Sequence, residues 1–144
     1  MTAALSDLRV VEMGQLLAGP FCGQLLADFG AEVIKLEPPG QGDPMREWGR
    51  EKADGRSLWW PVVARGKRSV TINLREKDGQ DLARRLIATA DVVIENFRPG
   101  TLEKWGMAPE VLMDHGQLLH SWQAPRLWGA LAAAGWFRLR STPR

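Results

Sequence analysis

The sequence contains one cysteine, Cys22, and only two histidines, His115 and His120, in 144 residues. A single cysteine excludes an intramolecular disulfide, and the two histidines match no metal-ligand spacing, so no metal site is expected. Cys22 lies among the apolar positions of a predicted helix. We therefore expect a packed thiol there rather than a nucleophile.

Long hydrophobic runs are also missing. No apolar segment approaches the roughly 20 residues that span a bilayer, and the N-terminus lacks a basic segment followed by a hydrophobic signal core. The composition, 44% hydrophobic and 25% charged residues, is ordinary for a globular domain. We expect a cytoplasmic protein that binds neither a membrane nor nucleic acid.

Acidic residues are absent from the end of the chain. Residues 1–115 hold all 17 acidic and 15 of the 19 basic residues, a formal charge of −2, whereas residues 116–144 hold four arginines and no other charged residue. This asymmetry predicts a boundary near Gly116. The expected organisation is a folded part over 1–115 and an aberrant basic tail over 116–144.

The stretch Val10–Asp43 predicts a strand, a loop of small residues, a helix and a second strand. The helix is expected from Phe21 to a stop at Gly30, and its apolar positions have helical spacing: Cys22, Leu25, Leu26 and Phe29. A parallel strand then follows over residues 33–36, so the unit is a right-handed βαβ crossover. Ligands of such sheets bind beyond the carboxyl ends of the strands.

The loop of this unit contains Gly14, Gly19 and Gly23, which do not have the GxGxxG spacing of a dinucleotide site. No Walker lysine follows either. Two interpretations stay open: the small residues approach a ligand closely, or they allow the helix to pack closely on the strand.

Residues 41–61 show little periodicity and predict a long irregular excursion. Its tryptophans, Trp48, Trp59 and Trp60, either pack the excursion onto the core or line a ligand groove. The next stretch, 64–74, predicts a basic turn followed by a strand in which Val70, Ile72 and Leu74 alternate with polar residues. Its cations, Arg65, Lys67 and Arg68, suit phosphate or carboxylate neutralisation, or form a solvated turn.

The pattern over residues 76–90 predicts an amphipathic helix whose apolar face holds Leu82, Leu86 and Ile87. A buried strand is expected over 91–95, and the NFRPG loop at 96–100 follows its carboxyl end. Thr101 is expected to cap a short helix that runs through Lys104 and ends at Gly106. Residues 117–121 predict a further strand.

Three segments carry a resemblance to a known family: AGPFCGQLLADFGAEVIKLEPPGQGD, GKRSVTINLR and DVVIENFRPGTLEKWGM. In this order they resemble the N-terminal part of the family III CoA-transferases, the CaiB/BaiF family, over roughly residues 5–113. The resemblance implies an α/β fold, a Rossmann-like parallel sheet with flanking helices, incomplete relative to the full family domain. It implies coenzyme A or an acyl-CoA as substrate, a carboxylate acceptor, and interlocked homodimers in full-length members.

The same resemblance implies a set of coenzyme A contacts in four loops and one helix: Leu17, Ala18, Pro38, Ile72, Asn73, Leu74, Arg75, Asn96, Phe97, Arg98 and Lys104. Formyl-CoA transferase has glutamine and arginine where this chain has Leu17 and Pro38, which argues against formyl or oxalyl substrates.

Transfer in the family uses an aspartate carboxylate that attacks the acyl-CoA and forms an anhydride and then an aspartyl thioester. That aspartate follows the NFRPG loop at a distance and has no counterpart here, so no catalytic residue is expected in this chain.

We hypothesise a frameshift near residues 116–125, because a shift of one base lets Arg126 to Trp128 encode the Gly-Tyr-Gly that the family has there. The alternative to the frameshift is a genuine C-terminal helix over 127–139. The alternatives to a CoA-transferase fragment are a non-catalytic CoA-binding module and a fragment related to α-methylacyl-CoA racemase.

Overall fold

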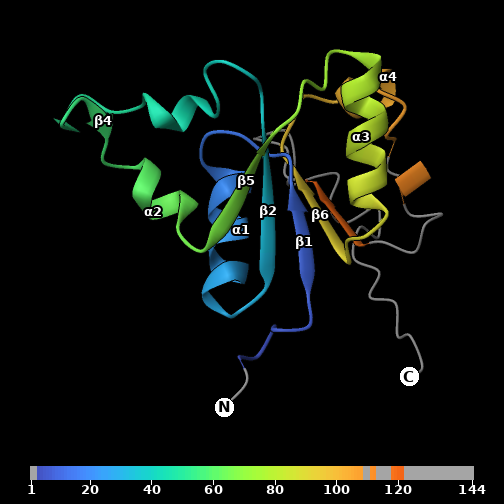
Figure 1. Ribbon diagram of the computed structural model, residues 1–144, viewed down its shortest axis with the longest axis horizontal. Coiled ribbons are helices and arrows are strands. Elements are labelled where there is room, and N and C mark those ends of the chain that lie inside the picture. Colours follow the sequence, from blue (N-terminus) through green and yellow to red (C-terminus); the bar gives the residue numbers. More distant parts are fainter. Residues whose placement is uncertain (1–2, 109–110, 113–117, 122–144) are drawn as a thin grey trace, which may run out of the picture.

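A parallel sheet of five strands forms the centre of the molecule (Figure 1). The computed structural model describes residues 3–108, 111–112 and 118–121. The strands of the sheet, in the spatial order β5-β2-β1-β6-β7, are β1 (Arg9–Glu12), β2 (Glu32–Glu37), β5 (Lys67–Thr71), β6 (Val92–Glu95) and β7 (Leu118–Ser121). The α/β prediction with a Rossmann-like parallel sheet is confirmed.

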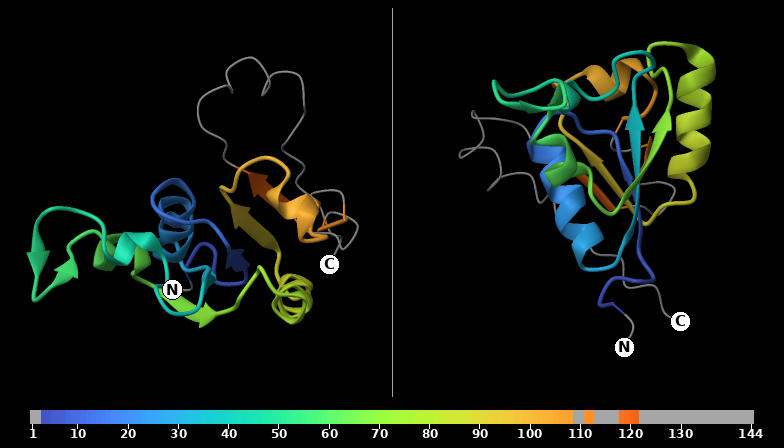
Figure 2. Two further views of the ribbon diagram at one scale, coloured as in Figure 1. Left: turned by 90° about the horizontal axis from the view of Figure 1, so that it is seen from above. Right: turned by 60° about the vertical axis from the view of Figure 1, so that its left-hand side comes forward.

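Helices cover both faces of this sheet, as the view from above in Figure 2 shows. Helix α1 (Ala18–Asp28) lies on one face, and α3 (Lys77–Ile87) and α4 (Thr101–Lys104) lie on the other, whereas the short α2 (Trp60–Ala64) packs against α1. Val10, Val33 and Ile94 pack with α1 on one face, whereas Val11 and Val93 pack with α3 and α4 on the other. The alternation follows from the two-residue period of a strand. None of the helices within the described ranges is long and apolar enough to cross a bilayer.

Helix α1 begins three residues earlier than predicted and buries a different face. Gly19, Pro20, Gly23 and Gln24 are its buried residues, whereas Leu25 and Phe29 are exposed. Glycines occupy two of these positions because a Cβ atom on Gly19 would collide with the loop after β1, and one on Gly23 would collide with Glu12 of β1. Cys22 is half-buried in the apolar cluster beside Leu26, and burial foremost, then the Glu12 charge, raises the pKa of its thiol, as expected for a packed cysteine.

The excursion after β2 contains more regular structure than its sequence predicts. It holds a 3-10 turn η1 (Pro44–Arg46), a small antiparallel hairpin of β3 (Lys52–Ala53) and β4 (Arg56–Ser57), and helix α2. Asp43 caps η1 by accepting a hydrogen bond from the Met45 amide. Such elements are too short to leave a periodic pattern.

Helix α3 ends at Ile87, three residues before its predicted end, and two of its three predicted apolar residues pack into the core. Ala83 and Ile87 are buried, Leu86 packs against the core cluster, and Leu82 is 48% exposed. In α4, Thr101 is the first helical residue rather than the cap. Gly100 occupies the cap position with a φ of 82°, a left-handed conformation that glycine adopts without strain.

The last described strand, β7, pairs with β6 in parallel, which confirms the strand expected near residues 117–121. The proposed boundary near Gly116 and most of the basic tail lie outside the described residues and stay predictions. At the opposite side of the sheet, β5 is the edge strand, and most of its residues are exposed. It begins at Lys67, within the stretch that was expected to be a basic turn.

Candidate functional site

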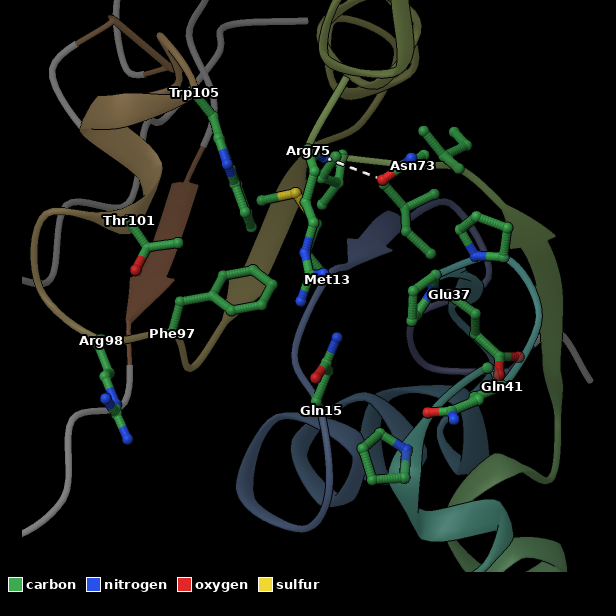
Figure 3. A pocket seen from close by; sticks show the side chains of 17 residues that line it. Met13, Gln15, Glu37, Gln41, Asn73, Arg75, Phe97, Arg98, Thr101 and Trp105 are labelled. Atoms are coloured by element: carbon green, nitrogen blue, oxygen red, sulfur yellow. Dashed lines mark hydrogen bonds between the residues drawn. The ribbon is translucent and has the colours of Figure 1, made fainter. Parts of the chain in front are cut away.

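A pocket of about 630 Å³ lies at the carboxyl end of the sheet (Figure 3). Because all five strands run in the same direction, the segments that follow β1, β2, β5 and β6 meet at one edge. Its wall is apolar where the strands end, at Met13, Leu36 and Ile72, and aromatic at Phe97 and Trp105. The two aromatic rings pack edge to face with centroids 5.1 Å apart.

Most of the coenzyme A contacts implied by the resemblance line this one pocket. Residues from three separate loops meet there: Pro38, Ile72, Asn73, Leu74, Arg75, Phe97 and Arg98. Leu17, Ala18, Asn96 and Lys104 are not part of the lining. Leu17 and Lys104 are exposed outside the pocket, and the side chain of Asn96 is hydrogen-bonded to the backbone of Gln15. The assignment of all these residues as ligand contacts stays a prediction.

Two arginines supply the positive charge of the pocket. Arg75 follows β5 and Arg98 follows β6, both are exposed, and neither forms an ion pair with any residue in the described part of the chain. In Figure 3, Arg75 points into the hollow and Arg98 lies at its outer edge. Guanidinium groups in such positions are suited to bidentate binding of phosphate or carboxylate oxygens.

The cations of the basic stretch instead pair with carboxylates of this chain, Arg65 and Arg68 at the surface and Lys67 in the interior. Arg65 pairs with Asp28 at 2.6 Å, and Arg68 pairs with Glu32 at 2.9 Å. The Lys67 ammonium lies 2.5 Å from the Glu12 carboxylate, and the Lys67 side chain is only 2% exposed. Burial lowers the pKa of Lys67, and the charge of Glu12 opposes this effect. These cations therefore neutralise carboxylates of this chain and do not face the pocket.

Glu37 places a carboxylate in the wall of the pocket. Burial opposes its ionisation, but hydrogen bonds from Arg46, from the Ser69 hydroxyl and from the Asp43 amide, together with the charge of Arg46, lower its pKa from 4.5 to about 2. Arg46 binds both carboxylate oxygens, at 2.7 and 2.8 Å, and its guanidinium lies 3.9 Å from the ring centre of Trp60. This arrangement fixes the excursion to the end of β2.

The glycines of the first loop serve close packing. A Cβ atom on Gly14 would lie 2.8 Å from the Cα of Gly19, and one on Gly23 would lie 2.0 Å from a carboxylate oxygen of Glu12. Of the two interpretations of these small residues, the packing one therefore holds for all three glycines.

The tryptophans of the excursion lie outside the lining of the pocket. Trp48 and Trp59 contact each other with ring centroids 6.0 Å apart, and each is 48% exposed. They neither fill the core nor line the groove, and Trp60 contacts Arg46.

The residues of the pocket that the sequence reasoning missed come from several elements. They include Met13 and Gln15 after β1, Glu37 at the end of β2, Gln41 in the excursion, Thr101 at the start of α4 and Trp105 at its end. Gln15 was detectable, because it lies three residues beyond the end of β1, where ligands of parallel sheets bind. Within the described ranges, no group of three or more histidine, cysteine or acidic side chains is placed to hold a metal ion.

Comparison with known proteins gives the same family over most of the chain. The model of CoA-transferase family III matches residues 5–116. Succinyl-CoA--D-citramalate CoA-transferase of Chloroflexus aurantiacus is 68% identical over 108 residues, which are 75% of this chain and 27% of that protein. Succinate--glutarate CoA-transferase of Agrobacterium fabrum is 49% identical over 114 residues, with 75% and 28% covered.

Solved structures agree with this assignment. A CAIB/BAIF family protein from Brucella suis superposes with a TM-score of 0.75 at 42% identity, covering 85% of this chain and 33% of that one. A hypothetical protein from Mycobacterium tuberculosis gives 0.77 at 39% identity, with 85% and 34% covered. This chain thus spans about a quarter to a third of the length of its relatives. With its fold, its pocket and these matches, the chain belongs to CoA-transferase family III.

Proposed function

We propose that this chain forms the coenzyme A binding part of a family III CoA-transferase and holds an acyl-CoA in the pocket at the carboxyl end of the sheet. The observation that carries the proposal is an apolar and aromatic wall beside two exposed arginines, Arg75 and Arg98, which form no ion pair among the residues that the structure describes. Coenzyme A has the complementary chemistry: phosphate groups at its nucleotide end and a long, weakly polar arm that ends in a thiol.

The reaction proposed for the whole protein is the transfer of coenzyme A from an acyl-CoA to a free carboxylate. Relatives from two organisms carry succinyl-CoA or succinate in their names, so we propose succinyl-CoA as the donor class. These relatives are transferases, which favours a transferase over the racemase-like alternative. The interlocked homodimer and the cytoplasmic location stay predictions.

We further propose that the 144-residue chain by itself does not catalyse CoA transfer. In the family that this chain resembles, the nucleophilic aspartate lies well beyond the NFRPG loop. The chain spans only about 27% of the length of its curated relatives. The non-catalytic binding module is therefore the function proposed for the chain alone. Acyl exchange between two CoA thioesters catalysed by the purified chain would overturn this point.

The binding proposal is tested by titrating the purified chain with coenzyme A in a calorimeter. Each of Arg75→Ala and Arg98→Ala is expected to weaken binding about tenfold or more, because each removes a charge-assisted hydrogen bond to a phosphate. Arg85→Ala, an exposed arginine of α3 outside the pocket lining, is the matched control and leaves the affinity unchanged. A folded sample that releases or absorbs no heat with coenzyme A contradicts the proposal.

A further inference from the structure

The loop between β1 and α1 has a backbone conformation that requires support. Leu16 has a φ of 64°, in the left-handed region where a branched, non-glycine residue is strained. Such a residue is energetically unfavourable and persists only where surrounding contacts hold it. The contacts around Gln15 and Leu16 therefore indicate which side chain this strained loop positions.

Two side chains hold the loop from opposite sides. The carboxamide of Asn96 accepts a hydrogen bond from the Gln15 amide and donates one to the Gln15 carbonyl, both at 2.8 Å. The carboxylate of Asp43 accepts a hydrogen bond from the Leu16 amide at 3.1 Å and one from the Met45 amide at 2.8 Å. Both bonds to Asp43 end on Oδ1.

The other oxygen of Asp43 belongs to a buried charge cluster. Oδ2 lies 2.7 Å from the ammonium of Lys35, and both side chains are 1% exposed. Lys35 also donates to Glu12 at 2.8 Å and to the carbonyl of Gly14, in the same loop, at 2.8 Å. Oδ1 of Asp43 thus accepts from two backbone amides, while Oδ2 supplies negative charge to the Lys35 ammonium. An asparagine keeps one oxygen and no charge, so it would either turn its NH2 group toward the ammonium or give up the acceptor for the Leu16 amide.

These contacts of Asn96 and Asp43 with the loop set the direction of the Gln15 side chain. Its side chain lines the pocket and points toward Arg75 across the hollow (Figure 3). A carboxamide both donates and accepts hydrogen bonds, so it suits a neutral polar group rather than a phosphate. In coenzyme A, such groups are the amides of the arm.

We propose that Gln15 is a ligand-binding residue that hydrogen-bonds an amide of the coenzyme A arm, and that Asp43 is the positioning residue that holds Gln15 there through the Leu16 amide. The proposal rests on the proposed function, because it assumes that coenzyme A occupies this pocket.

The test combines calorimetry with amide hydrogen exchange on the full 144-residue chain. The variants are Gln15→Ala, Asp43→Asn and the double variant, with Glu12→Gln as the matched control. Glu12→Gln removes one negative charge from the same buried cluster, but Glu12 binds Lys35 and Lys67 and no backbone amide of the loop. Coenzyme A is the titrant in every case.

We expect Gln15→Ala to weaken binding about fivefold, which corresponds to one hydrogen bond. Asp43→Asn is expected to weaken it by a similar factor and to remove the exchange protection of the Leu16 amide. The double variant then binds no more weakly than either single variant, because both act through the same contact. Glu12→Gln keeps the Leu16 protection and binds within about twofold of the unaltered chain.

Three results overturn the proposal. One is unchanged affinity in Gln15→Ala, and another is an additive loss in the double variant, which would place the effect of Asp43 elsewhere in the pocket. The third is an unprotected Leu16 amide in the unaltered chain, a measurement that does not depend on whether Asp43→Asn folds. Failure of the unaltered chain to bind coenzyme A overturns the proposed function as well, whereas normal binding with unchanged Gln15→Ala affinity overturns this inference alone.

Discussion

Glu37 shows how a single carboxylate links the sheet to the excursion. It is 2% exposed and takes hydrogen bonds from Arg46, Ser69 and the Asp43 amide. Although burial disfavours its charge, these bonds stabilise the ionised form more, and its pKa falls to about 2. The ionised state therefore contributes to the stability of the folded chain.

The pH dependence of stability follows from this shift. Because the folded pKa of Glu37 is lower than its ordinary value of 4.5, its contribution is present above pH 4.5 and is lost as pH falls toward about 2. We expect Glu37→Gln to have a lower free energy of unfolding than the unaltered chain at pH 7. Between pH 4.5 and about 2, the variant is expected to lose less of that free energy than the unaltered chain does.

Urea unfolding at a series of pH values measures this difference. Glu103→Gln, an exposed glutamate of α4, is the control and is expected to reproduce the unaltered profile. Parallel pH profiles for Glu37→Gln and the unaltered chain would contradict the role of Glu37.

At the scale of elements, the buried face of α3 is the clearest difference from the sequence pattern. Leu82 and Ile87 both fit a helical apolar face, yet Leu82 is 48% exposed and Ile87 is 1% exposed. The apolar residues of α3 form one arc, and Leu82 and Ile87 lie at its two ends, about 140° apart at 3.6 residues per turn. The sheet covers the end of the arc that holds Ile87, where the small side chain of Ala83 allows close approach.

This difference predicts unequal effects of two similar substitutions. Ile87→Ala is expected to lower the free energy of unfolding by about 2–4 kcal/mol, because it opens a cavity in the core. Leu82→Ala is expected to change it by less than about 1 kcal/mol, since half of that side chain is already in solvent. Urea unfolding of both variants checks this prediction, and equal losses would mean that the sequence pattern, not the structure, gives the correct face.

On the scale of the whole molecule, α1 presents an exposed apolar stripe. Phe21, Leu25 and Phe29 are 50%, 42% and 60% exposed, and their spacing of four residues aligns them on one side of the helix. The opposite side of α1 packs on the sheet through its small residues. Aligned apolar side chains in solvent favour association between molecules.

We therefore expect the purified chain to self-associate through this stripe. The double substitution Leu25→Gln and Phe29→Gln is expected to reduce association while changing the free energy of unfolding by less than about 1 kcal/mol, because neither side chain is buried. Sedimentation velocity over a range of concentrations measures the association. If the variant associates as strongly as the unaltered chain, the contact lies elsewhere.

The sequence by itself determined the strands of the parallel sheet, apart from the start of β5, together with the order of the βαβ unit and the family. Apolar runs such as Val92 to Ile94 and stops such as Gly30 are local signals, and residues near one another in the chain carry them. The rule that ligands bind beyond parallel strands also predicted the edge of the sheet where the pocket lies, and the family resemblance added Arg75 and Arg98, which line it.

Only the tertiary structure decided the role of each charged and small side chain. Lys67 was equally compatible with a phosphate, a carboxylate or solvent, until folding placed it 2.5 Å from Glu12, 55 residues earlier in the chain. Likewise, Asp43 holds Leu16 across 27 residues. The strength of such contacts depends on distance and burial, which exist only once the elements have packed, and no local pattern encodes them.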